Sequence, residues 1–107
     1  KYDEAQRLFS RFLDVNKGNP LEPQVRYLLG SSQYAAGKYK EAIVTQRDLA
    51  KDFPDNPKAP EALLSQASSQ IELKSIDGAK KTLKTLIDTY PNSPAAGLAK
   101  ERLTKLK

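Results

Sequence analysis

The 107-residue sequence contains no histidine, cysteine, methionine or tryptophan. Without histidine and cysteine it can build neither a zinc site of the usual kind nor a Ser-His-Asp triad, and it has no thiol nucleophile. The absence of cysteine also excludes disulfides, so the redox compartment cannot be inferred from cysteine usage. The serines stand in no catalytic motif, and there is no glycine-rich phosphate loop. We therefore expect no enzyme, no metal and no other cofactor.

Long apolar runs are also missing. The longest reach about three residues, as at 42–44, far below the roughly 20 needed to span a membrane. No signal peptide is visible and the chain opens at Lys1, so we interpret it as a mature segment or an excised domain whose targeting sequence has been lost. With 38% apolar and 29% charged residues the chain is typical of one globular domain. Its net charge of +5 favours an acidic partner weakly.

The sequence repeats with an offset of 37 residues. This shift carries Pro20 onto Pro57 and then onto Pro94, and it carries Pro54 onto Pro91. Apolar positions obey the same offset, which relates 12 to 49 and 86, and 53 to 90. A constant offset shared by prolines and apolar positions indicates a solenoid of repeated units.

Between the prolines the apolar spacing is helical. In the first segment the apolar residues recur at i, i+3, i+4, i+7 and i+8; they are Ala5, Leu8, Phe9, Phe12 and Leu13. In the last segment the stripe includes Arg102, which can lay its aliphatic stem on the seam. No stretch shows the sustained alternation of a strand. We predict helices over 3–16, 20–36, 39–53, 57–73, 76–90 and 94–106, that is, an all-α solenoid of antiparallel helix pairs.

The sequence also predicts where the helices begin and end. Three pairs, Asn19-Pro20, Asn56-Pro57 and Ser93-Pro94, each combine an N-cap residue with proline at the first helical position. Gly37 predicts a left-handed helix end. In the next unit Lys74-Ser75 replaces that turn, and Ser75 or Asp77 opens the following helix.

The units resemble the tetratricopeptide repeat. That pattern has Leu-Gly in the first helix, then a small residue, a large apolar residue and a proline. The matching residues are Leu29, Gly30, Ala42 and Pro54 in one unit, and Ala67, Ala79, Leu83 and Pro91 in the next. The departures are Gln33 and Gln70 in the usual tyrosine slot, Gln46 in a large apolar slot and Lys17 in place of the first proline.

We predict a single domain, 1–107, with four parts. Segment 1–19 is the second helix of a partial first repeat, 20–56 and 57–93 are complete repeats, and 94–107 is a capping helix. Because the first helix of the first repeat is missing, the stripe on the first predicted helix should be partly uncovered. Upstream residues or another copy of the chain should cover it.

Two proline-rich linkers, 53–60 and 90–96, and the segments 1–5, 37–42 and 94–103 resemble the CpoB (YbgF) family of periplasmic Tol-Pal-associated proteins. This resemblance implies a bacterial periplasmic protein that binds TolA and coordinates peptidoglycan synthesis with outer-membrane constriction in cell division. A peptidoglycan synthase is a second partner to be expected, and a separate trimerisation segment would belong to the parent protein. The alternatives are a homo-oligomerising repeat domain and another envelope scaffold, such as the repeat lipoprotein of the Bam complex.

A concave wall formed by the first helix of each pair is the expected binding surface of such a solenoid. The candidate residues are Gln24, Tyr27, Ser31, Tyr34, Glu61, Leu64, Ser68 and Ile71. Tyr27 and Tyr34 could serve as binding anchors or pack between helices. The wall lacks the Lys and Asn residues with which related domains hold a C-terminal carboxylate. Basic residues crowd 80–107 without interleaved aromatics, so we expect a solvated face and no nucleic-acid partner.

Overall fold

The computed structural model describes residues 1–106 and contains six α-helices there. Their bounds are α1 Tyr2–Val15, α2 Glu22–Ala35, α3 Tyr39–Asp52, α4 Lys58–Glu72, α5 Ile76–Thr89 and α6 Pro94–Lys105. No strand occurs in this range, as the apolar periodicity predicted. Residue 107, which ends the predicted segment 94–107, lies outside the described residues.

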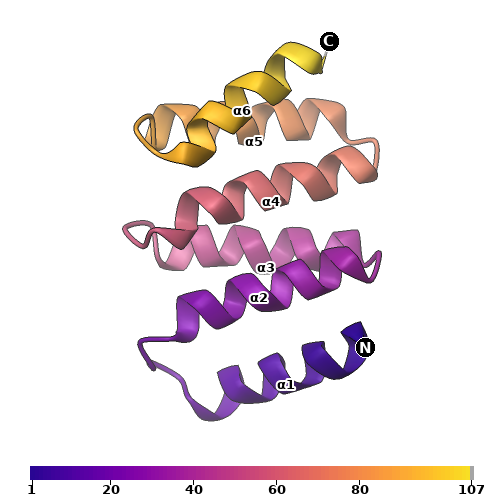
Figure 1. Ribbon diagram of the computed structural model, residues 1–107, viewed down its shortest axis with the longest axis vertical. Helices are drawn as coiled ribbons and strands as arrows, with labels where there is room; N and C mark the ends of the chain where they lie inside the picture. The colour runs from indigo at the N-terminus through magenta and orange to yellow at the C-terminus, as the bar shows by residue number, and fades with distance from the viewer. Residues whose placement is uncertain (107) are drawn as a thin grey trace.

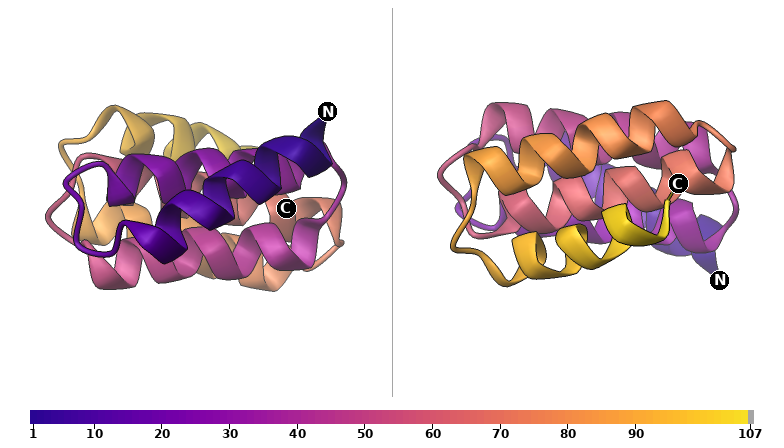
Figure 2. Two further views of the ribbon diagram at one scale, coloured as in Figure 1. Left: turned by 90° about the horizontal axis from the view of Figure 1, so that it is seen from below. Right: turned by 90° about the horizontal axis from the view of Figure 1, so that it is seen from above.

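The helices stack as antiparallel pairs in two layers, with the termini at opposite ends of the long axis (Figure 1). Helices α2, α4 and α6 lie nearer the viewer in Figure 1 than α3 and α5, and the end-on views separate α5 from α6 (Figure 2). Each helix packs on the next one in the chain, and α4 also contacts α2 and α6. Among residues 1–106 no such contact joins α3 to α5, so the α2–α4–α6 layer is the more tightly packed side.

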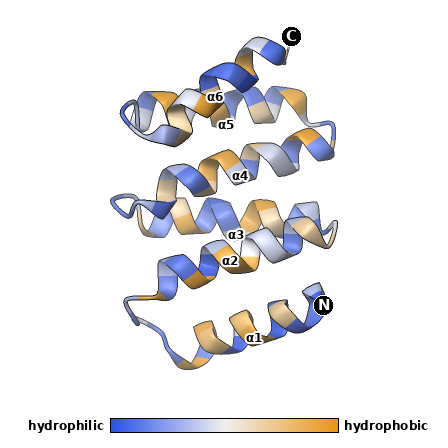
Figure 3. Cartoon of the chain, viewed as in Figure 1, coloured by the Kyte–Doolittle hydropathy of each residue, from blue (hydrophilic) through white to orange (hydrophobic). Residues whose placement is uncertain are grey.

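Small residues bring the helices together. Apolar and polar segments alternate along every helix (Figure 3), and the positions that face neighbouring helices are mostly alanine and leucine. Ala42, Ala67 and Ala79 have at most 1% of their surface exposed, and Leu49 and Leu83 have none. Small residues allow close helix approach while leucines fill the space between, so burial rather than helix propensity holds the pairs together.

The observed helix starts correct two of the three predicted caps. Helix α2 begins at Glu22 and α4 at Lys58, so Pro20 and Pro57 precede the helices instead of opening them. The carbonyls of Asn19 and Asn56 accept hydrogen bonds from the N–H groups of residues three positions on, 22 and 59. Residues four positions on, which would normally donate in a helix, are Pro23 and Pro60, and proline has no N–H.

The third predicted cap is present. Helix α6 begins at Pro94, and the Ser93 hydroxyl accepts a hydrogen bond from the Ala96 N–H at 3.1 Å. Here the residue four positions after the cap is Gly97, whose N–H is intact. The Asn19 and Asn56 side chains still accept from backbone N–H groups two residues on, each at 2.9 Å. They therefore shape the turn without standing at the helix boundary.

The predicted left-handed helix end is also found. Gly37 has φ +80°, and one repeat later Lys74 takes the same region with φ +64°. The N–H groups of Lys38 and Ser75, the next residues, return to the carbonyls of Gln33 and Gln70, each at 2.8 Å. This six-to-one hydrogen bond closes a helix whose last turn needs a positive φ, which glycine adopts more readily than lysine.

Helix α1 is the least covered element. It contacts α2 alone among the described helices. Its predicted apolar stripe is nowhere fully buried: Leu8 is 63% exposed, and Phe9 and Phe12 are half-buried. The expectation of a partly open stripe is therefore met within residues 1–106.

Candidate functional site

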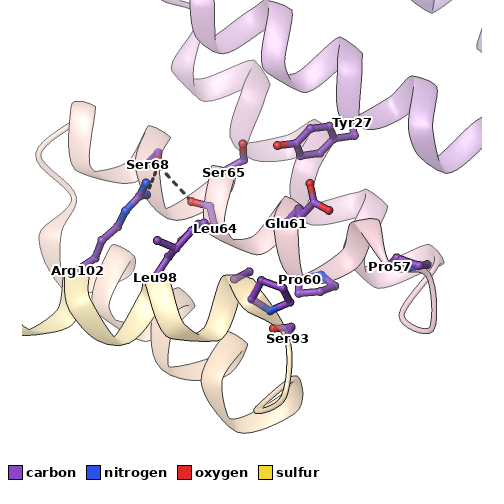
Figure 4. Close-up of a pocket in the computed structure, with 12 residues that line it drawn as sticks. Tyr27, Pro57, Pro60, Glu61, Leu64, Ser65, Ser68, Ser93, Leu98 and Arg102 are labelled. Carbon is purple, nitrogen blue, oxygen red and sulfur yellow. Dashed lines mark hydrogen bonds between the residues drawn. The ribbon is translucent and has the colours of Figure 1, made fainter.

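A groove of 710 Å³ lies where α2, α4 and α6 approach one another (Figure 4). Helical rows of side chains form its walls, because residues three or four positions apart share one face of a helix. The lining residues are Tyr27 from α2; Pro57, Pro60, Glu61, Leu64, Ser65 and Ser68 from α4 and its start; and Ser93, Pro94, Ala95, Leu98 and Arg102 from α6 and its start.

The floor of the groove is apolar and open to solvent. Leu64 packs against the buried cluster that contains Ala67 and Leu83, so its position is fixed by the core. Leu98 projects toward it from α6 and remains 48% exposed (Figure 4). An exposed leucine on a rigid apolar floor is the kind of surface that a partner's apolar side chain can cover.

Tyr27 forms the far wall and is held from two sides. It packs against the buried cluster of Leu49, Ala50, Ala59 and Ala62, and the Lys58 ammonium lies 4.7 Å from the centre of its ring. This cation–π geometry holds the ring over the start of α4. Tyr27 therefore packs between helices and lines the groove at once.

Two charged side chains line the groove, and their surroundings differ. Glu61 lies 3.4 Å from the Lys58 ammonium, which compensates its charge. Arg102 donates a hydrogen bond from Nη1 to the Ser68 hydroxyl oxygen, and that hydroxyl donates to the Leu64 carbonyl at 3.3 Å (Figure 4). No Asp or Glu of residues 1–106 lies within 4.0 Å of the Arg102 nitrogens.

Four of the eight predicted binding residues line this groove: Tyr27, Glu61, Leu64 and Ser68. The others, Gln24, Ser31, Tyr34 and Ile71, do not. Gln24 is exposed and Ser31 and Ile71 are half-buried. The binding role of all eight stays a prediction.

Tyr34 makes packing contacts instead. Its ring meets that of Tyr39 edge-to-face at 5.3 Å, and its hydroxyl donates to Glu72 at 3.4 Å, so it joins α2 to α3 and α4. Burial raises the pKa of the Tyr34 hydroxyl, and the neighbouring charges of Glu72 and Tyr39 and the hydrogen bond to Glu72 raise it further, while Arg102 partly offsets the rise. Tyr34 is thus neutral at physiological pH.

Sequence reasoning missed the contribution of α6 to the groove. A further shift of 37 residues carries Glu61 onto Leu98 and Ser65 onto Arg102. The repeat offset could therefore have found both residues if the last helix had been treated as a third wall instead of a cap.

Residues 1–106 contain no group of three or more Asp and Glu side chains placed to hold a metal ion. None of the described helices is long and apolar enough to cross a membrane.

Comparison with known families agrees with the repeat seen in the structure. A tetratricopeptide repeat model matches residues 1–57, and a second tetratricopeptide repeat model matches residues 61–93. No match to an individual curated protein was found. Because the first match alone covers more than half of the 107 residues, and because the helices pair in the antiparallel order of that repeat, the chain belongs to the tetratricopeptide repeat family.

Proposed function

We infer that this chain is a protein-interaction module of the bacterial cell envelope, of the CpoB type, which binds TolA in the periplasm. Tetratricopeptide repeats generally serve as non-enzymatic modules for protein–protein interaction, and the two family matches support that coarser role. The finer proposal is supported by the linkers 53–60 and 90–96, on which the resemblance to the CpoB family depends.

The observation that carries the proposal is the groove between α2, α4 and α6. The groove is rigid, because Leu64 in its floor and Tyr27 in its far wall are both packed against buried clusters. Its floor is solvated, because Leu98 is 48% exposed. A preformed apolar surface loses little conformational entropy on binding, so covering it with a partner is favourable.

The test measures binding of the periplasmic part of TolA by titration calorimetry. We expect Leu98→Ala to weaken binding by roughly 1–2 kcal/mol, since it removes apolar area from the groove. Val44→Ala is the matched control: Val44 is 45% exposed and lies on α3, outside the groove. Equal affinity of both variants and the wild type for TolA would contradict the groove as the binding site. If the wild type does not bind TolA, the CpoB-type role is wrong.

In this proposal the module serves cell division by linking TolA with the machinery of peptidoglycan synthesis, and a peptidoglycan synthase is the second partner. A pull-down that uses purified TolA and a purified synthase tests the link. The proposal requires that the synthase is retained only when the chain is present, and that fractionation finds the parent protein in the periplasm.

A second candidate function is self-association, and its support is the surface of α1. Tyr2, Leu8 and Val15 are 51%, 63% and 72% exposed, an apolar surface that a second copy of the chain could cover. Sedimentation equilibrium decides between the two functions. A concentration-dependent dimer that Leu8→Ser abolishes would favour self-association, whereas a monomer at all concentrations would exclude it.

A further inference from the structure

We propose that the groove selects an acidic apolar peptide: Arg102 binds the side-chain carboxylate of the partner, and Leu64 and Leu98 hold a neighbouring large apolar side chain. This proposal rests on the proposed function, in which the groove binds protein. It adds the chemistry by which a partner is chosen.

The Arg102 guanidinium has hydrogen-bond donors that the fold does not use. A guanidinium carries five N–H donors. The structure uses one of them, on the Ser68 hydroxyl, and within residues 1–106 no carboxylate pairs with this side chain. A guanidinium with free donors beside an apolar floor is suited to a carboxylate, which it can bind through two parallel hydrogen bonds.

The orientation of Arg102 is fixed before any ligand arrives. Its side chain reaches from α6 to Ser68 on α4, which is 34 positions away in sequence. The Ser68 hydroxyl uses its proton on the Leu64 carbonyl, so its oxygen is left to accept from Arg102 (Figure 4). These two successive hydrogen bonds, which link α6 to α4, therefore hold the guanidinium next to Leu64.

The other charge in the groove does not compete. Glu61 is compensated by Lys58, whose ammonium also lies over the Tyr27 ring. Arg102 would repel a basic peptide, and because Lys58 already compensates Glu61, the groove would offer that peptide no unpaired carboxylate. The net charge of +5 on the chain acts in the same direction, because it attracts acidic partners at long range.

The spacing of the apolar and charged contacts is set by α6. Leu98 and Arg102 lie on one helical face, and four residues of helix rise by about 6 Å. A matching partner places its carboxylate and its apolar side chain about as far apart. In a peptide this separation corresponds to two positions in an extended strand or about four in a helix.

A selection experiment on the 107-residue chain tests the proposal. Short random peptides are displayed on phage, each continued by coat protein so that none offers a free terminal carboxylate. We expect the selected peptides to be enriched in Asp or Glu within about four positions of a large apolar residue. Selection on Arg102→Gln should lose the acidic enrichment and keep the apolar one.

One selected peptide is then labelled with fluorescein and amidated at its C-terminus, and its binding affinity for each variant gives the contribution of Arg102. We expect Arg102→Gln to weaken binding about tenfold and Arg102→Lys to recover part of the loss, since lysine keeps the charge without the planar fork. Lys100→Gln is the matched control, because it removes one positive charge from an exposed position of α6 outside the groove and should change affinity by less than about twofold. Circular dichroism checks that each variant is folded.

The outcomes separate the two proposals. Selection of apolar peptides without acidic enrichment, or equal losses for Arg102→Gln and Lys100→Gln, overturns the acidic specificity and leaves the groove as a binding surface. If no peptide is enriched over uncoated support, the groove itself fails as a peptide-binding site.

Discussion

Gly30 lies so close to Gln46 that a β-carbon built on Gly30 would be 2.3 Å from Gln46 Nε2 and 2.6 Å from its Cδ. Both residues are buried, and the amide of Gln46 donates to the Tyr27 carbonyl at 3.3 Å. At this point of the contact between α2 and α3, the Gln46 side chain occupies the space that a β-carbon on residue 30 would need. The Leu-Gly pair recognised in the sequence has this contact as its physical reason.

The first prediction compares two helical glycines. Gly30→Ala should lower the free energy of unfolding by roughly 1–3 kcal/mol, because the new methyl group displaces the buried Gln46 side chain. Gly97→Ala is the control: nothing lies within 4 Å of its added β-carbon, so it should raise the free energy of unfolding by about 0.5–1 kcal/mol through helix propensity. Urea denaturation measures both. Equal stability of the two variants would contradict the close contact.

The second prediction concerns the buried amide of Gln46. The residue is 1% exposed, and its Oε1 has no hydrogen-bond partner among the described residues. We expect Gln46→Met to raise the free energy of unfolding by about 1 kcal/mol, since it removes an unpaired polar atom and nearly keeps the volume. Gln24→Met, at an exposed position of α2, should leave stability within about 0.5 kcal/mol of the wild type. A loss of stability in Gln46→Met would show that the hydrogen bond from Gln46 to the Tyr27 carbonyl stabilises the fold by more than the unpaired Oε1 destabilises it.

The third prediction contrasts two leucines. Leu83 on α5 has no exposed surface, whereas Leu8 on α1 is 63% exposed. Leu83→Ala should therefore cost roughly 2–5 kcal/mol, and Leu8→Ala less than about 1 kcal/mol. Thermal denaturation of dilute samples keeps self-association out of the comparison. A large loss in Leu8→Ala under these dilute conditions would contradict the exposed position of Leu8 on α1.

The fourth prediction concerns alkaline pH. Burial raises the pKa of both Tyr34 and Tyr90, with added contributions from Glu72 and Tyr39 at Tyr34 and from Asp55 at Tyr90. The unfolded chain thus loses these protons first, near pH 10, while the folded chain still holds them. Their contribution to stability is complete below that pH and falls as pH rises through the folded pKa values.

The variant that carries Tyr34→Phe and Tyr90→Phe isolates this effect. Tyr90 also donates to the Pro54 carbonyl at 2.6 Å, so the variant should be less stable than the wild type at pH 8. That difference should shrink between pH 9 and pH 11, because the wild type alone loses the tyrosine contribution there. A difference in unfolding free energy that stays constant with pH would contradict the raised pKa values.

Local physics made the helices predictable. Apolar residues at helical spacing, prolines at a constant offset of 37 and small residues in the seams all indicated an all-α repeat, because a repeated unit can bury its apolar face only against its neighbours. The hydrogen bond from Thr45 to Gln33 recurs one repeat later between Thr82 and Gln70, at 2.7 and 2.8 Å. Residues related by the 37-residue offset therefore make the same hydrogen bond in successive repeats.

Only the tertiary structure decided which residues share the groove. The sequence predicted Tyr27, Glu61, Leu64 and Ser68, which line the groove, but it also predicted Tyr34, whose ring packs on Tyr39 and whose hydroxyl donates to Glu72. It did not predict Leu98 in the groove and gave Arg102 only a packing role, because the groove depends on α6 lying against α4 and that contact joins residues more than thirty positions apart. Periodicity fixes which face of a helix is apolar, whereas the neighbour that covers that face is set by the packing of the whole stack.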